Sequence, residues 1–501
     1  MKLLGKVFLL LFLTAQFIYS TDYYLDSKNG SDTNSGLTPS NAWKTISKIN
    51  ENKFNPGDKI LFKSGLEWRG QLQVSSTGTA NAPIVINSYG EGNKPIIKGS
   101  NLAENWKKYS NTVWQLEFAQ NPGCIWLVDE DETIHWGLEK ESIDSLTKNY
   151  DFVWQDSLLY LCLDANLSGI FPQVECSIRD FGIITGWYGD GKDFIIIDNI
   201  EIMFTINSNI RAVGSKGWTI QNCILHHSGN TNESDGQGIQ YEGEDGIFRN
   251  NIIYENGQHG FFLSSFGNAD VNNNIIEKNT IYNNYHTSID LMNDGGSKNS
   301  HKNTIIRQNL VYDTPNFKGF EVGIQTLGYG NGLVTNVKIH HNIIAFINGA
   351  GISVVPNSDS IFIHNNTVYE TKSSCINLDN HQYYAEAYNN IGINHIYYAP
   401  FFVHNSKNKN ADNNIWNTDQ VSFVFVDGEY PETWEQYTSK YNFDKEGSSK
   451  DLNIQMEDLI PKIQHADSLS VNNGKDFGYK FDFYGNAIGD KTDIGAVENK
   501  I

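Results

Sequence analysis

A short phrase of apolar and polar positions recurs along the middle of the chain. It consists of an apolar residue, two variable residues, Asn, one variable residue and then Ile, Val or Leu, as in residues 276–281 and 306–311. Its asparagines are Asn250, Asn279, Asn309, Asn342 and Asn366, with weaker copies at Asn199, Asn222 and Asn389. Such recurrence is typical of a solenoid whose coils stack on one another. We expect the amides to form a ladder, each bonding to the amide of the next coil.

A second phrase follows each asparagine and predicts a strand. A small residue precedes alternating positions at 238–242, 260–264, 288–292, 323–327, 351–355 and 375–379. Alternation with a period of two directs one face into the core and the other face outward. The outward positions, one per coil, are Gln240, Phe262, Asp290, Gln325, Ser353 and Asn377. Helical periodicity is nearly absent, so we predict an all-β parallel β-helix.

The spacing of the asparagines measures the length of each coil. It is wide between Asn222 and Asn342 and shorter from Asn342 onward. In the wide coils, the extra residues lie before and after the strand of the second phrase. We therefore predict loops that wall a groove over residues 228–335, with the outward strand residues as its floor.

The parts outside the repeat are expected to cover it. Residues 105–178 contain several tryptophans and interrupt the repeat, which predicts an inserted β-rich subdomain. Residues 21–104 should form the N-terminal cap, with a short helix around Ile46 and Ile49, and the first coils. The coils with the groove are expected over 179–404, and an irregular tail that packs on the β-helix over 405–501.

The first 20 residues have the layout of a cleaved secretory signal peptide. Their apolar run is too short to span a membrane, and no second run follows, so we expect no membrane insertion. The first cysteine is Cys124, which leaves no lipid-anchor cysteine near the cleavage point. The protein is therefore expected to be secreted or periplasmic.

Charge narrows the range of partners. The chain has 58 acidic and 37 basic residues, with a net charge of -21. This balance argues against nucleic acid, and it weakens the case for a polyanionic substrate unless a cation compensates. The five cysteines are scattered and should mostly be buried, although a disulfide between Cys162 and Cys176 is possible. We expect a monomer.

Several short segments indicate a known fold. Residues 24–32, the stretch from Trp43 to Ile46, residues 56–62 and residues 493–498 resemble the pectin-lyase-like right-handed β-helix superfamily. The resemblance spans nearly the whole chain. It implies a right-handed parallel β-helix and a polysaccharide substrate, which exported members cleave as lyases or glycoside hydrolases. No catalytic motif of a known subgroup is matched cleanly, so no catalytic residue is carried over.

The groove contains candidates for two reactions. Elimination beside a uronate carboxyl needs a base, which His286, His259 or Lys318 could supply, with Tyr285 or Arg307 assisting. Hydrolysis needs two carboxyls, and Asp290 could act with Asp235, Asp294 or Glu321. His286 and Glu321 have the same offset on adjacent coils, about 5 Å apart, so the pair could orient the imidazole or be a surface ion pair.

Other groove residues are candidates for binding. Phe262 could be an exposed platform for a sugar ring, and Gln240 and Gln325 could bind hydroxyls beside it. Asp235, Glu242 and Asp294 are weak candidates for Ca²⁺ ligands. We place elimination slightly ahead of hydrolysis because of the resemblance and the histidines. The third alternative is a surface β-helix that binds glycans without cleaving them.

Overall fold

The computed structural model describes most of the chain after residue 19. The described residues are 20–163, 172–186, 191–229, 236–265, 269–294, 299–314, 322–379, 383–394, 399–406, 409–417, 424–450, 452, 455–457, 460–462, 470–489 and 491–498. Nearly all of the predicted signal peptide therefore lies outside them. No helix among the described residues is long and apolar enough to cross a membrane.

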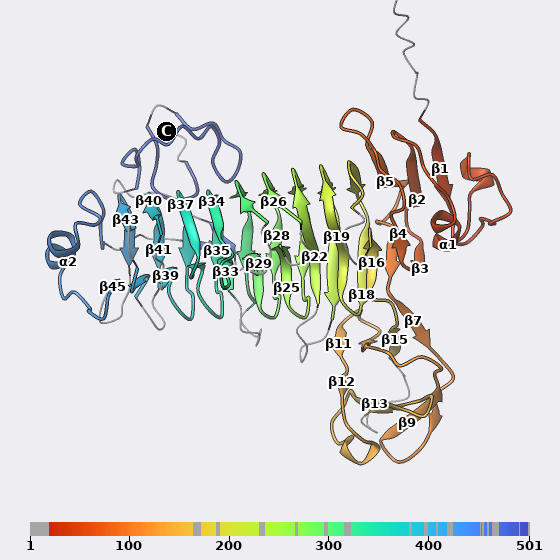
Figure 1. Ribbon diagram of the computed structural model, residues 1–501. Coiled ribbons are helices and arrows are strands. Elements are labelled where there is room, and N and C mark those ends of the chain that lie inside the picture. The colour runs from red at the N-terminus through yellow and green to blue at the C-terminus, as the bar shows by residue number, and fades with distance from the viewer. Residues whose placement is uncertain are drawn as a thin grey trace, which may run out of the picture.

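Three long parallel sheets run side by side along the molecule (Figure 1). The chain passes from sheet I to sheet II to sheet III in each coil, and each strand pairs in parallel with the strand of the next coil. This is the predicted parallel β-helix.

In the described part of the chain, sheet I has fourteen strands and sheets II and III have eleven each. The strands of sheet I are β1 (Asp22–Leu25), β2 (Lys59–Lys63), β5 (Ile84–Tyr89), β17 (Ile195–Asp198), β20 (Thr219–Gln221), β23 (Ile247–Arg249), β26 (Val271–Asn272), β27 (Ile275–Glu277), β30 (His301–Lys302), β31 (Ile305–Arg307), β34 (Val334–His340), β37 (Ser358–His364), β40 (Ala385–Tyr388) and β43 (Lys409–Asp412). Sheet II has eleven. They are β3 (Glu67–Arg69), β6 (Ile96–Lys98), β18 (Glu201–Thr205), β21 (Ile224–Ser228), β24 (Ile252–Tyr254), β28 (Thr280–Tyr282), β32 (Leu310–Tyr312), β35 (Ile343–Ala345), β38 (Thr367–Tyr369), β41 (Ile391–Ile393) and β44 (Ile415–Asn417).

Sheet III contains the strands of the second phrase and also has eleven strands. They are β4 (Leu72–Gln73), β16 (Phe181–Ile184), β19 (Ser208–Lys216), β22 (Gln237–Glu244), β25 (His259–Ser264), β29 (Thr287–Asn293), β33 (Val322–Gly328), β36 (Ile352–Val354), β39 (Ile376–Asp379), β42 (Phe401–His404) and β45 (Val424–Val426). Its middle strands, from β19 to β33, are the longest in the sheet, and β22 to β33 lie in the coils where the sequence predicts the groove.

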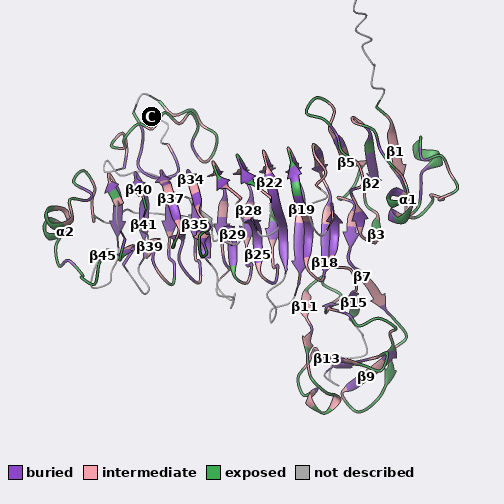
Figure 2. Cartoon of the chain, viewed as in Figure 1, coloured by how far each residue is buried: buried purple, intermediate pink, exposed green. Residues whose placement is uncertain are grey.

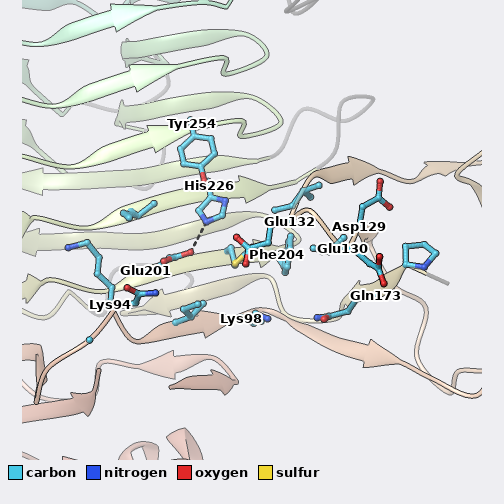
Figure 3. Close-up of a pocket in the computed structure, with 18 of the residues that line it drawn as sticks. Lys94, Lys98, Asp129, Glu130, Glu132, Gln173, Glu201, Phe204, His226 and Tyr254 are labelled. Atoms are coloured by element: carbon cyan, nitrogen blue, oxygen red, sulfur yellow. Dashed lines mark hydrogen bonds and ion pairs between the residues drawn. The ribbon is translucent and has the colours of Figure 1, made fainter. Parts of the chain in front are cut away.

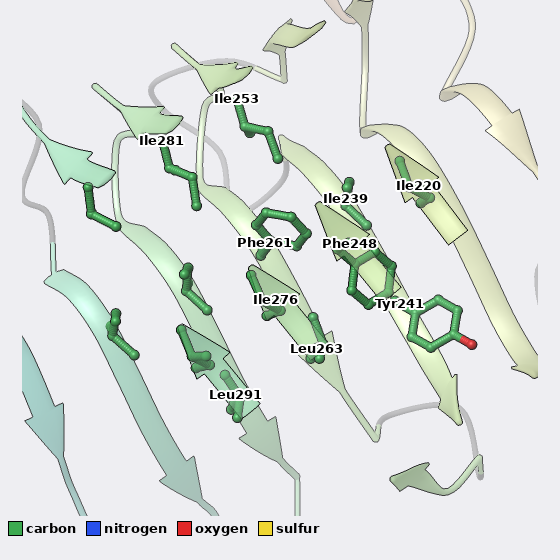
Figure 4. Close-up of a cluster of buried hydrophobic side chains, with 14 of the residues drawn as sticks. Ile220, Ile239, Tyr241, Phe248, Ile253, Phe261, Leu263, Ile276, Ile281 and Leu291 are labelled. Carbon is green, nitrogen blue, oxygen red and sulfur yellow. The ribbon is translucent and has the colours of Figure 1, made fainter. Parts of the chain in front are cut away.

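The core fills the space between the three sheets. Ile253, Phe261, Ile281 and Leu291 point inward and have no exposed surface (Figure 4). Burying one such side chain contributes about 1.5–3 kcal/mol. Figure 2 shows that buried strands alternate with more exposed turns along the whole stack. The inward positions of the repeat therefore hold the coils together and leave the outward positions available for chemistry.

The asparagine ladder lies between sheets I and II, and part of the prediction is wrong by one residue. The bonded series is Asn251, Asn279, Asn309, Asn342, Asn366, Asn390 and Asn414, each donating its side-chain amide to the next at 3.0–3.1 Å. By contrast, Asn199, Asn222, Asn250 and Asn389 precede the ladder position and have positive φ. Asparagine tolerates that left-handed conformation better than most residues. In the turns at Asn250 and Asn389, two neighbouring positions therefore hold asparagine for different reasons.

The corrected ladder still identifies the long coils. Its successive steps are 28, 30 and 33 residues up to Asn342 and 24 residues in each coil after it. Part of the extra length falls on residues 230–235, 266–268, 295–298 and 315–321, which lie outside the described residues. The predicted walls of the groove therefore stay a prediction, while the floor can be examined.

Residues 100–177 form two small sheets beside the β-helix, mostly with antiparallel pairing (Figure 1). The strands are β7 (Ser100–Ala103), β8 (Lys107–Lys108), β9 (Val113–Glu117), β10 (Cys124–Val128), β11 (Ile134–Trp136), β12 (Leu138–Glu139), β13 (Asp151–Gln155), β14 (Leu158–Cys162) and β15 (Gln173–Ser177), with the short helix η2 (Ile143–Ser145). We call this region the insert. All five cysteines of the chain are buried and none is in a disulfide, so the bond between Cys162 and Cys176 that the sequence allowed is not formed.

The two ends of the stack are covered by helices. At the N-terminal end, η1 (Pro39–Asn41) precedes α1 (Ile46–Asn50), which Thr45 caps and which buries Ile46 and Ile49 as expected. At the C-terminal end, α2 (Trp434–Tyr441) places the buried Tyr437 where its hydroxyl donates to Asp444 at 2.6 Å. Asp444 also accepts the last amide of the ladder, from Asn414. The ladder therefore ends on a partner supplied by the cap.

The described part of the tail packs on the β-helix. The tail also contains one short strand pair, β46 (Gln455–Glu457) and β47 (Ile460–Lys462). Tyr479 stacks on His340 with the ring centroids 4.0 Å apart, and Phe477 stacks on His364 at 3.9 Å. Burial lowers the pKa values of His340, His341 and His364, and that of His341 falls to about 3. These histidines are therefore neutral beneath the tail.

We expect the tail to loosen in acid. Above pH 6.5 the histidines are neutral whether the tail is docked or not, so they add no pH dependence. Below pH 6.5 the undocked state takes up protons that the docked state cannot accept, and docking weakens as the pH falls. Hydrogen exchange of residues 470–498 should be faster at pH 5 than at pH 7.5, after correction for intrinsic rates. Replacing His341 by Gln should reduce this difference, and an unchanged difference would contradict the assignment.

Candidate functional site

Asp290 lies at the centre of the outward column of sheet III. The register pairs Arg211 with Gln240, Gln240 with Phe262, Phe262 with Asp290, and Asp290 with Gln325. The column continues through Ser353 to Asn377. The predicted alignment of these residues is therefore confirmed as a continuous row with one residue from each coil, while its role as the floor of a groove stays a prediction.

The carboxyl of Asp290 is buried, with 3% of the residue exposed. The side-chain amide of Gln325 donates to its Oδ1 at 3.3 Å, and Nδ1 of His259 lies 3.8 Å from its Oδ2. Burial raises the pKa of Asp290 to about 7, although the bond from Gln325 acts in the opposite direction. Asp290 is thus about half protonated at neutral pH and largely protonated below it, and the protonated form is the state required of a general acid.

His259 and His286 lie beside this carboxyl. The His259 ring stacks on Phe262 with centroids 4.8 Å apart, and it meets the His286 ring edge to face at 5.2 Å. Burial lowers the pKa of both imidazoles, and the neighbouring His286 lowers that of His259 further. Nδ1 of His286 is 3.0 Å from the hydroxyl of Thr287. Both histidines can therefore accept a proton, but neither carries a positive charge in the resting site.

Phe262 is not the exposed platform that the sequence suggested. It points away from the core as expected, but only 6% of the residue is exposed and His259 covers its ring. The imidazole covers one face of this ring, so a sugar could not stack there without displacing it. Phe262 instead fixes the plane of His259 next to Asp290.

Glu242 lies farther along the floor, on β22, and is fully buried. Its Oε1 accepts a bond from Gln240 at 3.1 Å and lies 3.9 Å from Nη2 of Arg211. A carboxylate held by an arginine and an amide is a poor match for the weak Ca²⁺ candidate suggested by the sequence. Among the described residues, no group of three or more His, Cys, Asp and Glu could hold a metal ion. Asp294, half-buried just after β29, belongs to no such group, and Asp235 lies outside the described residues.

Arg211 is a floor residue that the sequence reasoning missed. It occupies the column one coil before Gln240, and its guanidinium lies 5.5 Å from the centre of the Phe181 ring. The signal was present, because residues 208–216 contain an alternating strand like the others. Their preceding asparagine belongs to a weak copy of the repeat, which made the coil harder to recognise.

Tyr285 lies at the corner between sheets II and III, next to His286. Its ring meets the edge of Trp136, from β11 of the insert, at 5.4 Å. Burial raises the pKa of Tyr285, and the charge of Glu255 adds to that effect. The insert therefore reaches the border of the floor, and Tyr285 is placed to contact a ligand only along that border.

Three other predicted residues do not join this cluster. Arg307 is on β31 of sheet I, where its guanidinium bonds Glu277 at 2.6 Å and 2.9 Å. Arg307 was predicted to assist in the groove, but its strand belongs to sheet I and not to sheet III, which carries the floor. Lys318 and Glu321 lie outside the described residues, so the proposed pair of His286 and Glu321 stays a prediction.

Comparisons with known proteins agree with this architecture. The family described as "Right handed beta helix region" matches residues 175–432. A lacto-N-biosidase of Bifidobacterium longum subsp. longum is 36% identical over 109 residues, which is 21% of this chain and 6% of that protein. The chain thus spans a small part of the length of this relative.

Solved structures extend the likeness over almost the whole chain. The structure of XylC in complex with xylose has a TM-score of 0.60 at 15% identity, covering 95% of this chain and 98% of that one. Pectate lyase Pel9A has a TM-score of 0.54 at 14% identity, covering 97% and 98%. At these identities the likeness shows a shared fold alone.

Proposed function

The chain belongs to the right-handed β-helix family, and we propose that it is an exported glycoside hydrolase that cleaves a neutral glycan over sheet III. The observation that carries this proposal is the buried carboxyl of Asp290 in the middle of the floor, whose pKa burial raises to about 7. Hydrolysis of a glycosidic bond needs an acid that protonates the leaving oxygen, and a carboxyl with a raised pKa is suited to that step. The name of the Bifidobacterium relative and the xylose bound by XylC support the same reading.

The second carboxylate of this mechanism is best supplied by Glu242. Neighbouring strands are about 4.8 Å apart, so Asp290 lies two coils, or roughly 10 Å, from Gln240. Glu242 reaches back to Gln240, and Arg211 lies beside its charge. A glycosidic bond between them would face a neutral acid on one side and a charged carboxylate on the other. A separation of this order is far too long for direct attack on the sugar and lies near the upper end of the range for a base acting through water. Glu321, Asp294 and Asp235 stay as alternatives from the sequence.

Elimination is the second candidate, and the likeness to a pectate lyase favours it. A neutral His286 or His259 could take the proton beside a uronate carboxyl. That carboxyl would also need a cation, and on the described floor Arg211 already lies beside Glu242. The excess of acidic residues adds to this difficulty, so we place hydrolysis ahead of the elimination that the sequence favoured.

One assay separates these alternatives. The secreted protein is incubated with a panel of neutral and uronate-containing polysaccharides while reducing ends and unsaturated ends are followed together. Hydrolysis produces reducing ends without unsaturated ends, and elimination produces both in equal number. Absence of both products over a broad panel would favour a β-helix that only binds glycans.

The pH dependence of turnover tests the role of Asp290. If its protonated form is the catalytic acid, kcat/KM should fall about tenfold per pH unit once the pH rises well above 7. The physical reason is that loss of the proton removes the acid while the fold stays intact. A profile that is flat between pH 6 and pH 9 would contradict this role.

A further inference from the structure

A cavity lies between the insert and sheet II, across the sheet corner from the floor around Asp290. Its volume is about 980 Å³, at the upper end of ordinary ligand pockets of roughly 300–1,000 Å³. One wall is the outer face of β6, β18, β21 and β24, and the opposite wall is the hairpin that joins β10 to β11 (Figure 3). Asp290 and its neighbours on the floor do not line it. We call it the insert pocket.

The polar side chains of the sheet wall are held in fixed positions. Oε1 of Glu201 and Nε2 of His226 form a hydrogen bond of 3.2 Å. The His226 ring stacks on Tyr254, with ring centroids 4.6 Å apart and planes 8° from parallel. On its far side, Nδ1 of His226 lies 2.6 Å from Nδ1 of His227, which is fully buried. A ligand would therefore meet a carboxyl whose position is already set, which lowers the entropy cost of binding.

The charges of the pocket favour a neutral ligand. Asp129, Glu130 and Glu132 of the hairpin face the cavity together with Glu201, against two lysines, Lys94 and Lys98. Lys98 is already paired with Glu67 at 2.7 Å and Glu175 at 3.3 Å, and Lys94 donates to Asn199. An anionic sugar would meet an excess of carboxylates, whereas the hydroxyls of a neutral sugar can donate to them.

Apolar residues complete the recognition surface. Ile96, Met203, Phe204 and Ile224 line the sheet wall, and Val128, Ile134 and Pro172 line the side of the insert. A pyranose presents hydroxyls at its rim and C–H groups on its faces, so it needs this mixture of carboxyls, amides and apolar contacts. A cavity with acidic and amide groups over an apolar wall matches that chemistry more closely than it matches a lipid or a phosphate.

We propose that the insert pocket is a second saccharide-binding site, selective for neutral sugars and separate from the floor around Asp290. Glu201 and Glu132 accept bonds from sugar hydroxyls, and His226 positions Glu201. The choice of a saccharide rests on the proposed function, but the existence of the site does not require cleavage. Trp136, which packs on Trp126 at 4.2 Å, links the hairpin to Tyr285 at the border of the floor. One glycan could thus be held by the insert while another part of it is cleaved.

Binding to the full-length Asp290→Asn protein tests this proposal without turnover. The probes are xylotriose, cellotriose, mannotriose and galactotriose, with trigalacturonate as the acidic probe, measured by calorimetry. At least one neutral probe should bind, and the double change Glu132→Ala and Glu201→Gln should weaken it at least tenfold. Glu132→Ala alone, on the exposed turn, should weaken it measurably even if Glu201→Gln destabilises the wall. The matched control is Glu141→Gln, an exposed acid of the insert outside the pocket, which should have no effect.

Three results would overturn the proposal. They are no binding of any neutral probe, equal affinity in the pocket variants and the parent, and binding of trigalacturonate that the pocket variants abolish. Failure of the proposed function is recognised separately. If the wild-type protein cleaves glycans while the pocket variants bind normally, only the pocket is wrong. If the pocket binds and no glycan is hydrolysed, only the hydrolase assignment is wrong.

Discussion

Replacing Asp290 by Asn should lower kcat on the cleaved glycan by roughly 10²–10⁴-fold, the usual contribution of a general acid. The variant should keep its fold, because the carboxyl it replaces is largely neutral below pH 7 and the amide oxygen can still accept the bond from Gln325. Initial rates at saturating substrate measure the loss, and the midpoint of thermal unfolding measures the fold. Activity within threefold of wild type would contradict the assignment of Asp290.

Two further variants make the result specific. Asp359→Asn changes an aspartate on β37 of sheet I, away from the floor, and should leave kcat unchanged. His286→Ala removes the imidazole that faces His259 and should also abolish turnover. Loss of turnover in His286→Ala with a normal rate in Asp290→Asn would favour elimination by a histidine base. Normal rates in both would exclude this cluster as the catalytic site.

The floor of sheet III could be predicted because strand alternation is a local property. Once Ile289 and Leu291 are inside the core, Asp290 must point outward, whatever else surrounds it. Parallel pairing at constant register then aligns Asp290 with Phe262 and Gln325. The same reasoning could not show that Phe262 is covered, because that depends on which rotamer His259 adopts above it.

The position of the ladder was harder to infer for a different reason. Asn250 and Asn251 are adjacent, and the first has a left-handed backbone while the second forms the hydrogen bonds. Sequence spacing alone cannot separate these two uses of asparagine, so the prediction followed Asn250 in one coil and Asn279 in the next. Contacts with the insert, such as that of Trp136 with Tyr285, join segments far apart in the chain and have no local signal.

The choice between hydrolysis and elimination depends on environment more than on residue type. Asp290 has an ordinary pKa in the unfolded chain, and only burial raises it to about 7. The sequence showed that a carboxyl and two histidines are present. It could not show the desolvation that raises the pKa of Asp290 and makes this carboxyl an acid. For the same reason it could not show that Arg211 lies beside Glu242.

The ladder should be the most sensitive structural element of the stack, and Asn309→Ala tests it. The Asn309 amide donates to Asn342 at 3.0 Å and to the carbonyl oxygen of Ile276 at 2.9 Å. Its oxygen accepts from both the backbone N–H and the side chain of Asn279 at 3.0 Å. Alanine would leave these buried groups without partners, at about 1–3 kcal/mol each if no water enters. We expect a loss of about 3–5 kcal/mol in the free energy of unfolding, measured by denaturant titration.

The matched control is Asn410→Ala on β43, an exposed asparagine whose amide contacts the Tyr388 hydroxyl. Water can replace that partner, so the expected loss is within about 1 kcal/mol. Asn309 lies within the long coils, and a ladder break there should loosen β31 and β32 before the short coils after Asn342. Hydrogen exchange of residues 305–312 should therefore increase more than that of 385–393. Equal losses in the two variants would mean that core packing, and not the amide ladder, holds successive turns in register beneath the floor.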